Sequence, residues 1–335
     1  MQNLALVVAL LTCFISAWAS QTAPGKYTGG ERYDIPAWFK DSFLDIAEDA
    51  TEAGESDKHL LLFMHLDGCP YCATMMRESF IGSDFSPWLR KRFDSVAINV
   101  KGDREIAFNK DLTVTEKELA RALKVNYTPA IVFLNAGNQQ VFRADGYRAS
   151  GDFHKILRYV DAKAYQKQDL ATYLREQAQE KLYAFRSNPQ FVDTRDLSDV
   201  GDKPLLVVFE DKRCASCNKF HDNLNNARIV PWLERLTVVR LDADDTAPLT
   251  APDGSITTPR AFARQLNLSY RPGSVLFDRG AEVARIDNLL RVWHLHVVLR
   301  YVSERHFRKY PTWLDFGRVY RAQTLAAGQD IDLSE

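Results

Sequence analysis

The sequence has few cysteines and no excess of charge. Only five of the 335 residues are cysteine, and apart from Cys13 they form two C-x-x-C pairs, Cys69/Cys72 and Cys214/Cys217. No cysteine is left for a scaffold of structural disulfides, so stability must come from packing. The formal net charge is −1, so composition gives no sign of a nucleic-acid partner or of binding to an anionic membrane surface.

Long apolar runs are also scarce, and the one that occurs is at the N-terminus. It spans 4–19 and ends in Ala17-Trp18-Ala19, a small-x-small cleavage pattern. The run is short for a bilayer span, which needs about 20 residues. It predicts a signal peptide over 1–19, a linker over 20–32 and export to the periplasm, with an uncleaved membrane anchor as the alternative.

The first C-x-x-C pair follows an apolar segment that is short enough for a buried strand. The segment His59–Leu66 breaks at Asp67-Gly68 and continues as a helix-compatible stretch from Cys69. Free N–H groups and the positive end of a helix dipole stabilise a thiolate at such a position. The thiolate is the nucleophile in disulfide exchange, and Cys72, one turn later, can resolve the mixed disulfide.

Other readings of two cysteines three residues apart remain open at this point. They could form half of a zinc site or a structural disulfide, or they could occur by chance. A haem attachment site requires C-x-x-C-H, and Ala73 after Cys72 excludes it.

The chain then repeats itself with a period of 142 to 145 residues. Four landmarks recur in the same order: the C-x-x-C pairs at 69 and 214, Pro-Trp-Leu at 87 and 231, a proline at 129 and 272, and Leu-Arg-Tyr-Val at 157 and 299. This period is too long for a solenoid. It predicts a duplicated domain, with one copy at 33–188 and the other at 189–335.

Each copy has the same predicted order of elements. A strand leads into the C-x-x-C helix, and a second strand, a loop insertion, a helix, two strands and a terminal helix follow. This order predicts an α/β fold with a central mixed sheet flanked by helices. The predicted strands are 60–66, 95–100, 130–134 and 140–143 in the first copy, and 205–209, 237–241, 275–278 and 282–286 in the second. Each copy also appends an amphipathic helix, at Leu170–Tyr183 and Trp313–Leu325.

This arrangement resembles the thioredoxin fold, duplicated in tandem. A redox C-x-x-C after the first central strand is expected to face a cis-proline roughly 60 residues later. Pro129 follows Cys69 by 60 residues, and Pro272 follows Cys214 by 58. The resemblance implies that the residues before these prolines, Thr128 and Arg271, offer their backbone to the bound partner.

A longer string in the first copy resembles the SoxW family of periplasmic thioredoxins. Its motifs are GCPYC, NVKGDRE (99–105), TEKELARALKVNYTPAIVF (115–133), Gly146-Tyr147 and 153–159. The likeness covers roughly 32–183 well and the second copy loosely. It implies a disulfide reductase of periplasmic proteins that takes electrons from a membrane thiol donor and needs no bound cofactor.

The sequence departs from typical thioredoxins near the cysteines. Those proteins carry a buried acid six residues before the first cysteine, where this chain has Phe63 and Val208. Four residues before it stand His65 and Glu210, which could substitute if their side chains reach the site.

The two pairs differ in the charges beside them. Cys69 follows Asp67-Gly68, whereas Cys214 follows Lys212-Arg213 and is expected to face Arg271. A nearby cation lowers a cysteine pKa and stabilises the reduced dithiol. We therefore expect Cys214–Cys217 to be the more oxidising pair, with electrons passing from the first site to the second. The alternative is that these charges are exposed and screened.

Other polar residues are weaker candidates. His294 and His296 do not share a helix face, and His221 lies four residues after Cys217 but lacks two further zinc ligands. The acidic stretch Asp242–Asp245 is expected to be solvated. No metal site is predicted.

The resulting hypothesis is an exported protein disulfide oxidoreductase. Cys69 and Cys214 attack, Cys72 and Cys217 resolve, and Thr128-Pro129 and Arg271-Pro272 dock the substrate. One alternative is copper or zinc binding by the four thiolates together. The other is a partner-binding scaffold in which only one domain turns over.

Overall fold

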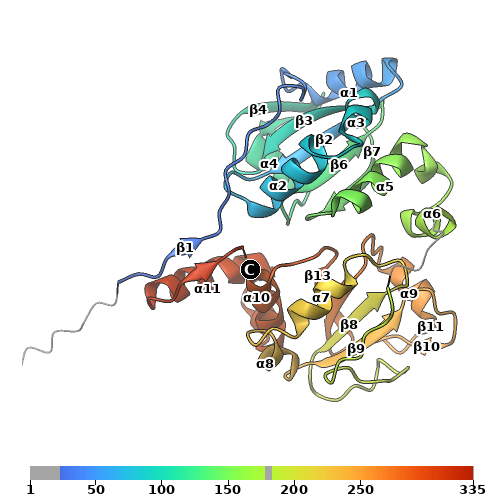
Figure 1. The fold of residues 1–335 in the computed structure, drawn as a ribbon, viewed down its shortest axis with the longest axis vertical. Coiled ribbons are helices and arrows are strands. Elements are labelled where there is room, and N and C mark those ends of the chain that lie inside the picture. The colour runs from blue at the N-terminus through green and yellow to red at the C-terminus, as the bar shows by residue number, and fades with distance from the viewer. Residues whose placement is uncertain (1–22, 178–182, 335) are drawn as a thin grey trace, which may run out of the picture.

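The computed structural model describes residues 23–177 and 183–334, which form two four-stranded mixed sheets (Figure 1). The predicted signal peptide over 1–19 lies outside the described residues. The first sheet has the order β3-β2-β6-β7 and the second the order β9-β8-β12-β13. Their strands are β2 His59–His65, β3 Phe93–Asn99, β6 Ala130–Leu134 and β7 Gln140–Asp145, then β8 Leu205–Glu210, β9 Thr237–Asp242, β12 Gly273–Asp278 and β13 Ala281–Ile286.

The two sheets also pair their strands in the same directions. In the first, β2 is parallel to β3 and antiparallel to β6, which is antiparallel to β7. In the second, β8 is parallel to β9 and antiparallel to β12, which is antiparallel to β13. All eight strands lie within two residues of their predicted bounds. The α/β class and the mixed sheets predicted from the sequence are confirmed.

Helices cover both faces of the first sheet because successive residues of β2 point to opposite sides. Leu61 and Phe63 join a cluster with α2 (Pro70–Met75), the π-helical turn η1 (Met76–Ile81) and α5 (Ser150–Asp161). Leu60 and Leu62 join the opposite cluster, with α1 (Ile46–Glu55) and α4 (Glu116–Ala122). All seven residues of β2 are buried, so the strand that leads to Cys69 is held from both sides.

The second sheet is covered in the same way. Leu206 and Val208 pack with α7, α8, α10 and α11, whereas Leu205 and Val207 pack with α9. These helices are α7 Cys217–Leu224, α8 Val230–Leu233, α9 Pro259–Gln265, α10 Val292–Ser303 and α11 Trp313–Ala326. Apart from α7, the predicted helices in this half begin and end within one residue of those observed.

The loop insertion predicted in each copy contains a small antiparallel pair that the sequence analysis did not identify. In the first copy it pairs β4 (Glu105–Asn109) with β5 (Leu112–Thr115). In the second it pairs β10 (Leu249–Thr250) with β11 (Ile256–Thr257). These strands have two to five residues, too few for a periodic pattern. Helices α1 and α3 (Ser86–Arg92) were likewise not singled out.

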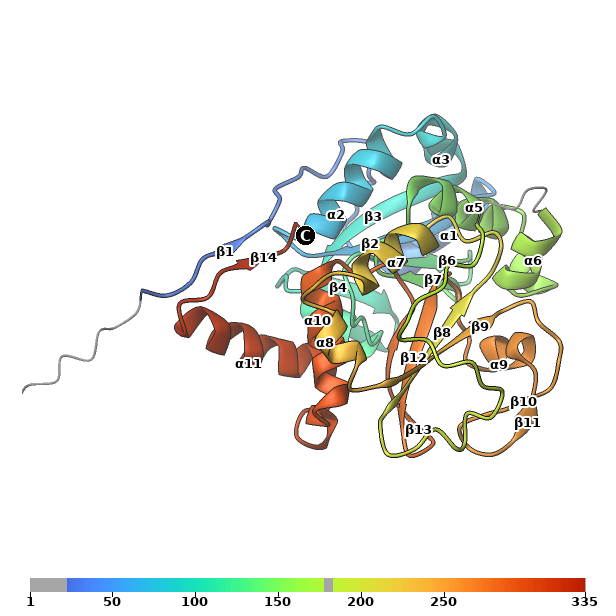
Figure 2. The same ribbon diagram turned by 60° about the horizontal axis from the view of Figure 1, so that its bottom comes forward.

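The segment 20–32, predicted as a linker, contains a short strand in its described part. Strand β1 (Tyr27–Thr28) pairs in parallel with β14 (Ile331–Asp332), near the other end of the chain (Figure 2). The backbone N–H of Ile331 donates to Lys26 O at 2.8 Å. A glycine-rich segment gave no local signal for this strand, since its partner lies about 300 residues away.

The two appended helices are present. Helix α6 begins at Leu170, as predicted, and is described to Gln177; 178–182 lie outside the described residues, and the predicted end at Tyr183 is wrong because Tyr183 is not helical. Helix α11 packs with α10 through Trp313 and Phe316. Within 23–177 and 183–334, no helix has the length and apolar character needed to cross a bilayer.

The two-sided core predicts matched effects of mutations on either face of β2. Leu61→Ala and Leu62→Ala should each lower the free energy of unfolding by about 2–5 kcal/mol, because each leaves a cavity in a different buried cluster. Ile81→Ala is the control, since Ile81 is 53% exposed and should change it by about 0.5 kcal/mol or less. Denaturant unfolding measures all three. A loss for only one of the two leucines would contradict the two-sided packing.

Candidate active site

Cys69 caps the helix that follows β2. Its sulfur accepts a hydrogen bond from the Cys72 backbone N–H at 3.2 Å, and Pro70 occupies the first turn of α2. Proline favours this start because its φ angle suits a helix and its missing N–H would have had no helical acceptor. The free amides and the positive end of the dipole therefore face the Cys69 sulfur. The helix start predicted at Cys69 is confirmed.

The turn at Pro129 lies against the same sulfur. The Thr128–Pro129 peptide bond is cis, as expected. Cys69 Sγ lies 3.5 Å from the carbonyl oxygen of Thr128, and the Thr128 hydroxyl donates to Cys69 Sγ at 3.5 Å. The structure therefore brings Cys69, Cys72, Thr128 and Pro129 together. Their roles in attack, resolution and docking stay predictions.

The two thiols of the first pair are free and buried, but their pKa values move in opposite directions. Burial acts to raise the pKa of Cys69, but hydrogen bonds from Cys72 and Thr128 outweigh it and hold this pKa below its ordinary value. Burial, followed by the hydrogen bond and charge of Cys69, raises the pKa of Cys72 well above its ordinary value. Cys69 is thus the sulfur prepared to act as a nucleophile.

Tyr33, a residue the sequence analysis did not single out, places its hydroxyl beside Cys72. This hydroxyl donates to Leu66 O at 3.2 Å and lies 2.8 Å from His65 Nδ1. Its hydrogen bond to Cys72 acts to lower the pKa of that thiol. Burial raises the pKa of Tyr33 and lowers that of His65, so both are neutral near pH 7.

His65 therefore reaches the first site, but through Tyr33 rather than directly. Phe63, which stands where typical thioredoxins carry an acid, is buried in the core. The polar groups beside Cys72 are instead the neutral side chains of Tyr33 and His65, with Tyr33 in contact with the thiol. Tyr33 lies 36 residues before Cys69, and no motif spacing links the two, so sequence reasoning had no signal for it.

The second pair is arranged differently from the first. Cys214 and Cys217 form a disulfide with an S–S distance of 1.97 Å, and α7 begins only at Cys217. The prediction that the helix begins at Cys214 is therefore wrong. The Asp211 carboxylate accepts a hydrogen bond from the Arg213 N–H at 2.8 Å, and Ala215 stands where the first pair has Pro70. The chain turns at Cys214 and becomes helical three residues later.

The cations near Cys214 are matched by carboxylates, which the sequence analysis did not anticipate. Arg213 pairs with Asp211 at 3.3 Å and also with Asp244. Arg271, before the cis Arg271–Pro272 bond, lies 3.7 Å from Asp211. The expectation that Asp242–Asp245 is only solvated is wrong at Asp244 and at Asp245, which pairs with Arg195. The order of the two redox potentials stays a prediction, and its electrostatic basis is weaker than the sequence implied.

Glu210 and His221 pair with each other beneath the second disulfide. His221 Nε2 lies 2.7 Å from Glu210 Oε1, and the Tyr183 hydroxyl donates to Glu210 Oε2 at 3.1 Å. Tyr183 belongs to one small apolar cluster with Cys214 and Cys217. Each half thus places a tyrosine from the preceding segment on the polar residue four positions before its first cysteine.

His294 and His296, on α10, each pack against aromatic side chains. His294 Nδ1 lies 3.3 Å from the Tyr71 hydroxyl, and His296 packs among Trp232, Trp293 and Tyr320. Burial lowers the pKa of each to about 4. Across 23–177 and 183–334, no group of three or more His, Cys, Asp or Glu side chains is arranged to hold a metal ion.

The loops around the first sulfur pair contact the second half. Tyr71 lies between Cys69 and Cys72 in the sequence, and its hydroxyl accepts a hydrogen bond from Arg291 N at 2.7 Å. The Tyr127 hydroxyl, beside the cis-proline turn, donates to Arg285 O at 2.7 Å. Gly146 approaches Asn288 so closely that a Cβ atom would lie 2.1 Å from its side-chain nitrogen. Residues 285–291 therefore pack against the loops that flank the first sulfur pair.

The lowered pKa of Cys69 predicts its alkylation profile. The rate of Cys69 alkylation by iodoacetamide should rise with pH with a midpoint below about pH 8.5, the ordinary pKa of a thiol. Cys72 should stay unreacted over the same range. Thr128→Val removes one hydrogen-bond donor and should move the Cys69 midpoint upward. Mass spectrometry of peptides quenched across a pH series measures both. An alkylation midpoint at or above the ordinary thiol pKa, with no change in Thr128→Val, would contradict the lowered pKa of Cys69.

The contact between Tyr33 and Cys72 predicts a slower resolving step in Tyr33→Phe. Without the hydroxyl the pKa of Cys72 rises further, so less thiolate is present at a given pH. One lost hydrogen bond of about 0.5–1.5 kcal/mol corresponds to a slowing of roughly two- to tenfold. Release of thionitrobenzoate from a mixed disulfide at Cys69 measures the rate. Tyr27→Phe, at an exposed site, is the control, and equal rates in both variants would rule the contact out.

Comparison with known proteins places the first half in a recognised fold. Residues 46–161 match the family model of a thioredoxin-like domain. A thioredoxin-fold protein from Helicobacter pylori is 21% identical, covering 39% of this chain and 92% of its own, with a TM-score of 0.33. A thioredoxin from Thermus thermophilus is 22% identical over 47% of this chain and 99% of its own, with a TM-score of 0.28. The oxidoreductase DsbH is 20% identical over 40% of this chain and 95% of its own, also with a TM-score of 0.28.

No curated protein matches the chain. The family model covers about a third of the sequence, so it identifies the first half alone. The protein is a mixed α/β protein in which residues 46–161 form a thioredoxin-like domain.

Proposed function

We propose that the protein is an exported thiol–disulfide oxidoreductase that reduces disulfides in periplasmic proteins through two C-x-x-C sites. The observation that carries this proposal is the environment of Cys69. Its sulfur accepts hydrogen bonds from the Cys72 N–H and the Thr128 hydroxyl at the start of α2. A thioredoxin-like domain with such a site has the general chemistry of disulfide exchange.

The reaction moves two electrons from the Cys69/Cys72 dithiol to the partner. The Cys69 thiolate attacks one sulfur of the partner disulfide, forms a mixed disulfide and releases the other sulfur as a thiolate. Cys72 then loses its proton and attacks Cys69 Sγ, which releases the second partner sulfur and leaves Cys69–Cys72 oxidised. The Tyr33 hydroxyl supports this second step by stabilising the Cys72 thiolate. A membrane thiol donor would restore the dithiol.

The second half serves in this proposal as a second thioredoxin-like domain of a tandem duplication. Its sheet has the same strand order and directions as the first, and its cis Arg271–Pro272 bond corresponds to Thr128–Pro129. The domain boundaries at 33–188 and 189–335 follow from the repeat. Cys214 is the attacking sulfur and Cys217 the resolving one. The apolar run at 4–19 and the likeness to the SoxW family support a periplasmic location.

Partner trapping tests this function directly. Cys72→Ser and Cys217→Ser each remove a resolving thiol, so mixed disulfides with periplasmic proteins should accumulate at Cys69 or Cys214. Diagonal non-reducing and reducing electrophoresis of periplasmic extracts measures them. Cys69→Ser/Cys72→Ser and Cys214→Ser/Cys217→Ser are the matched controls. Equal capture by a trap and its control would overturn the proposed role of that site.

A further inference from the structure

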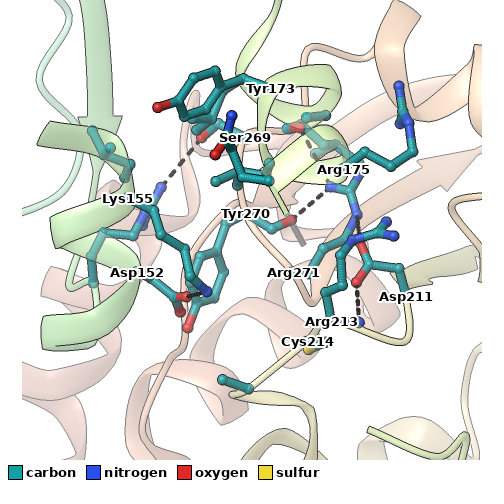
Figure 3. A pocket seen from close by; sticks show the side chains of 18 of the residues that line it. Asp152, Lys155, Tyr173, Arg175, Asp211, Arg213, Cys214, Ser269, Tyr270 and Arg271 are labelled. Atoms are coloured by element: carbon teal, nitrogen blue, oxygen red, sulfur yellow. Dashed lines mark hydrogen bonds and ion pairs between the residues drawn. The ribbon is translucent and has the colours of Figure 1, made fainter. Parts of the chain in front are cut away.

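A cavity of about 580 Å³ lies between the two halves and reaches the second disulfide (Figure 3). Helices α5 and α6 of the first half form one wall. The Cys214 turn and the loop 268–271 of the second half form the other. Sites for small molecules have volumes of about 300–1,000 Å³. Cys214 lines this cavity, whereas Cys217 is fully buried and is not part of the lining.

The lining carries an excess of positive charge. Six cationic side chains and three carboxylates face the cavity: Arg148, Lys155, Arg158, Arg175, Arg213 and Arg271, with Asp152, Asp211 and Asp244. Lys155 pairs with Asp152 at 3.2 Å, and Arg213 pairs with both remaining acids. Arg271 and Arg175 lie 3.7 Å from Asp211 and Asp244 respectively, and Arg148 lies 3.9 Å from Asp287 outside the lining, so the six cations share four carboxylates and keep a net positive charge.

Two of the guanidinium groups are buried with incomplete hydrogen bonding. Arg148 is fully buried and stacks 4.6 Å from the centre of the Tyr270 ring, and its Nε has no hydrogen-bond partner. Arg271 Nε likewise has none. Burying a cation with unsatisfied donors is costly unless a counter-charge is close. Arg148 has Asp287 at 3.9 Å and Arg271 has Asp211 at 3.7 Å as counter-charges, both beyond hydrogen-bond distance. An anion in the cavity would therefore add the hydrogen-bond acceptor that these carboxylates do not provide.

Arg175 adds a third guanidinium, and it is the most adaptable of the three. It projects from α6, is partly exposed, and its Nη1 lies 3.7 Å from Asp244 Oδ1, beyond hydrogen-bond distance. Arg148 and Arg175 come from the first half, whereas Arg271 precedes the cis-proline of the second. The charge excess beside Cys214 therefore depends on both halves.

We propose that this cavity binds a small thiol or disulfide that carries carboxylate groups and exchanges it with Cys214–Cys217. The inference rests on the proposed function and names the substrate class of the second site. A thiolate of the bound ligand attacks Cys214 Sγ, forms a mixed disulfide and releases Cys217 as a thiolate. A second ligand thiolate attacks the ligand sulfur, which yields the ligand disulfide and the Cys214 thiolate. Two thiols are oxidised, one protein disulfide is reduced, and the two thiol protons pass to the cysteines.

Rate constants for two thiols test the charge preference. The protein carries Cys69→Ser and Cys72→Ser, so that only the second disulfide reacts, and the reductants are mercaptosuccinate and the neutral 1-thioglycerol. Each rate is divided by the rate of the same thiol with a small free disulfide at the same pH. The corrected rate should favour mercaptosuccinate about tenfold, the effect of one charge-assisted hydrogen bond, and the preference should shrink with added salt.

Arg175→Gln should remove most of this preference and leave the 1-thioglycerol rate unchanged. It is chosen over changes at Arg148 or Arg271, whose burial makes misfolding the expected result. Arg318→Gln on α11 is the matched control, because it removes the same charge from an exposed site outside the cavity. It should retain the full preference.

A thioether that cannot exchange separates binding from chemistry. S-methylmercaptosuccinate should bind by calorimetry, and Arg175→Gln should weaken the binding about tenfold. Binding without reduction by either thiol would overturn the proposed exchange at the second site and support the anion site. Equal corrected rates for the two thiols, or no thioether binding, would overturn the anion site while leaving disulfide exchange intact.

Discussion

The hydrogen bond from the Cys72 amide to the Cys69 sulfur is the contact on which the chemistry of the first half depends. It exists because β2, buried on both faces, delivers the chain to a helix that Cys69 caps and whose first residue is Pro70. Burial acts to raise both pKa values, and the hydrogen bond between the two cysteine side chains then lowers the pKa of Cys69 and raises that of Cys72, with the Cys72 amide adding to the lowering at Cys69. An exchange reaction needs this inequality, because one sulfur must attack before the other.

The second half keeps the sheet but not this contact. Its first cysteine lies in a turn shaped by Asp211, three residues before the helix begins. Arginines and aspartates surround the disulfide, and part of that charge comes from the first half. The loops that flank Cys69 in the first half in turn contact residues 285–291 of the second. Residues of both halves therefore surround each cysteine pair, and the interface gives the two pairs different surroundings.

Local patterns in the sequence predicted the strands, most helices and the cis prolines. The eight strands of the two main sheets have periodic or continuous apolar character over four or more residues, and the repeated landmarks in the sequence supplied an independent check on each. The spacing of 60 and 58 residues between cysteine and proline was sufficient to identify Pro129 and Pro272. These features depend on residues near each other in the chain or on a repeat that is visible in it.

Features that depend on distant residues were missed. Tyr33 reaches Cys72 from outside any motif, and β1 finds its partner β14 at the far end of the chain. The late start of α7 follows from an aspartate turn that competes with the helix. The charges at Cys214 were misjudged because adjacent Lys212 and Arg213 are visible in the sequence, whereas the carboxylate of Asp244 arrives only through folding.

A redox titration of the first pair tests the central claim most directly. In a protein with Cys214→Ser and Cys217→Ser, the Cys69/Cys72 pair is equilibrated with glutathione or dithiothreitol buffers, and its oxidation state is read by mass after alkylation. The account predicts one reversible two-electron transition between reduced and disulfide forms, within about −270 to −120 mV, where thioredoxin-like proteins fall. If no Cys69–Cys72 disulfide formed at any buffer potential, that result would contradict the proposed disulfide exchange at the first pair.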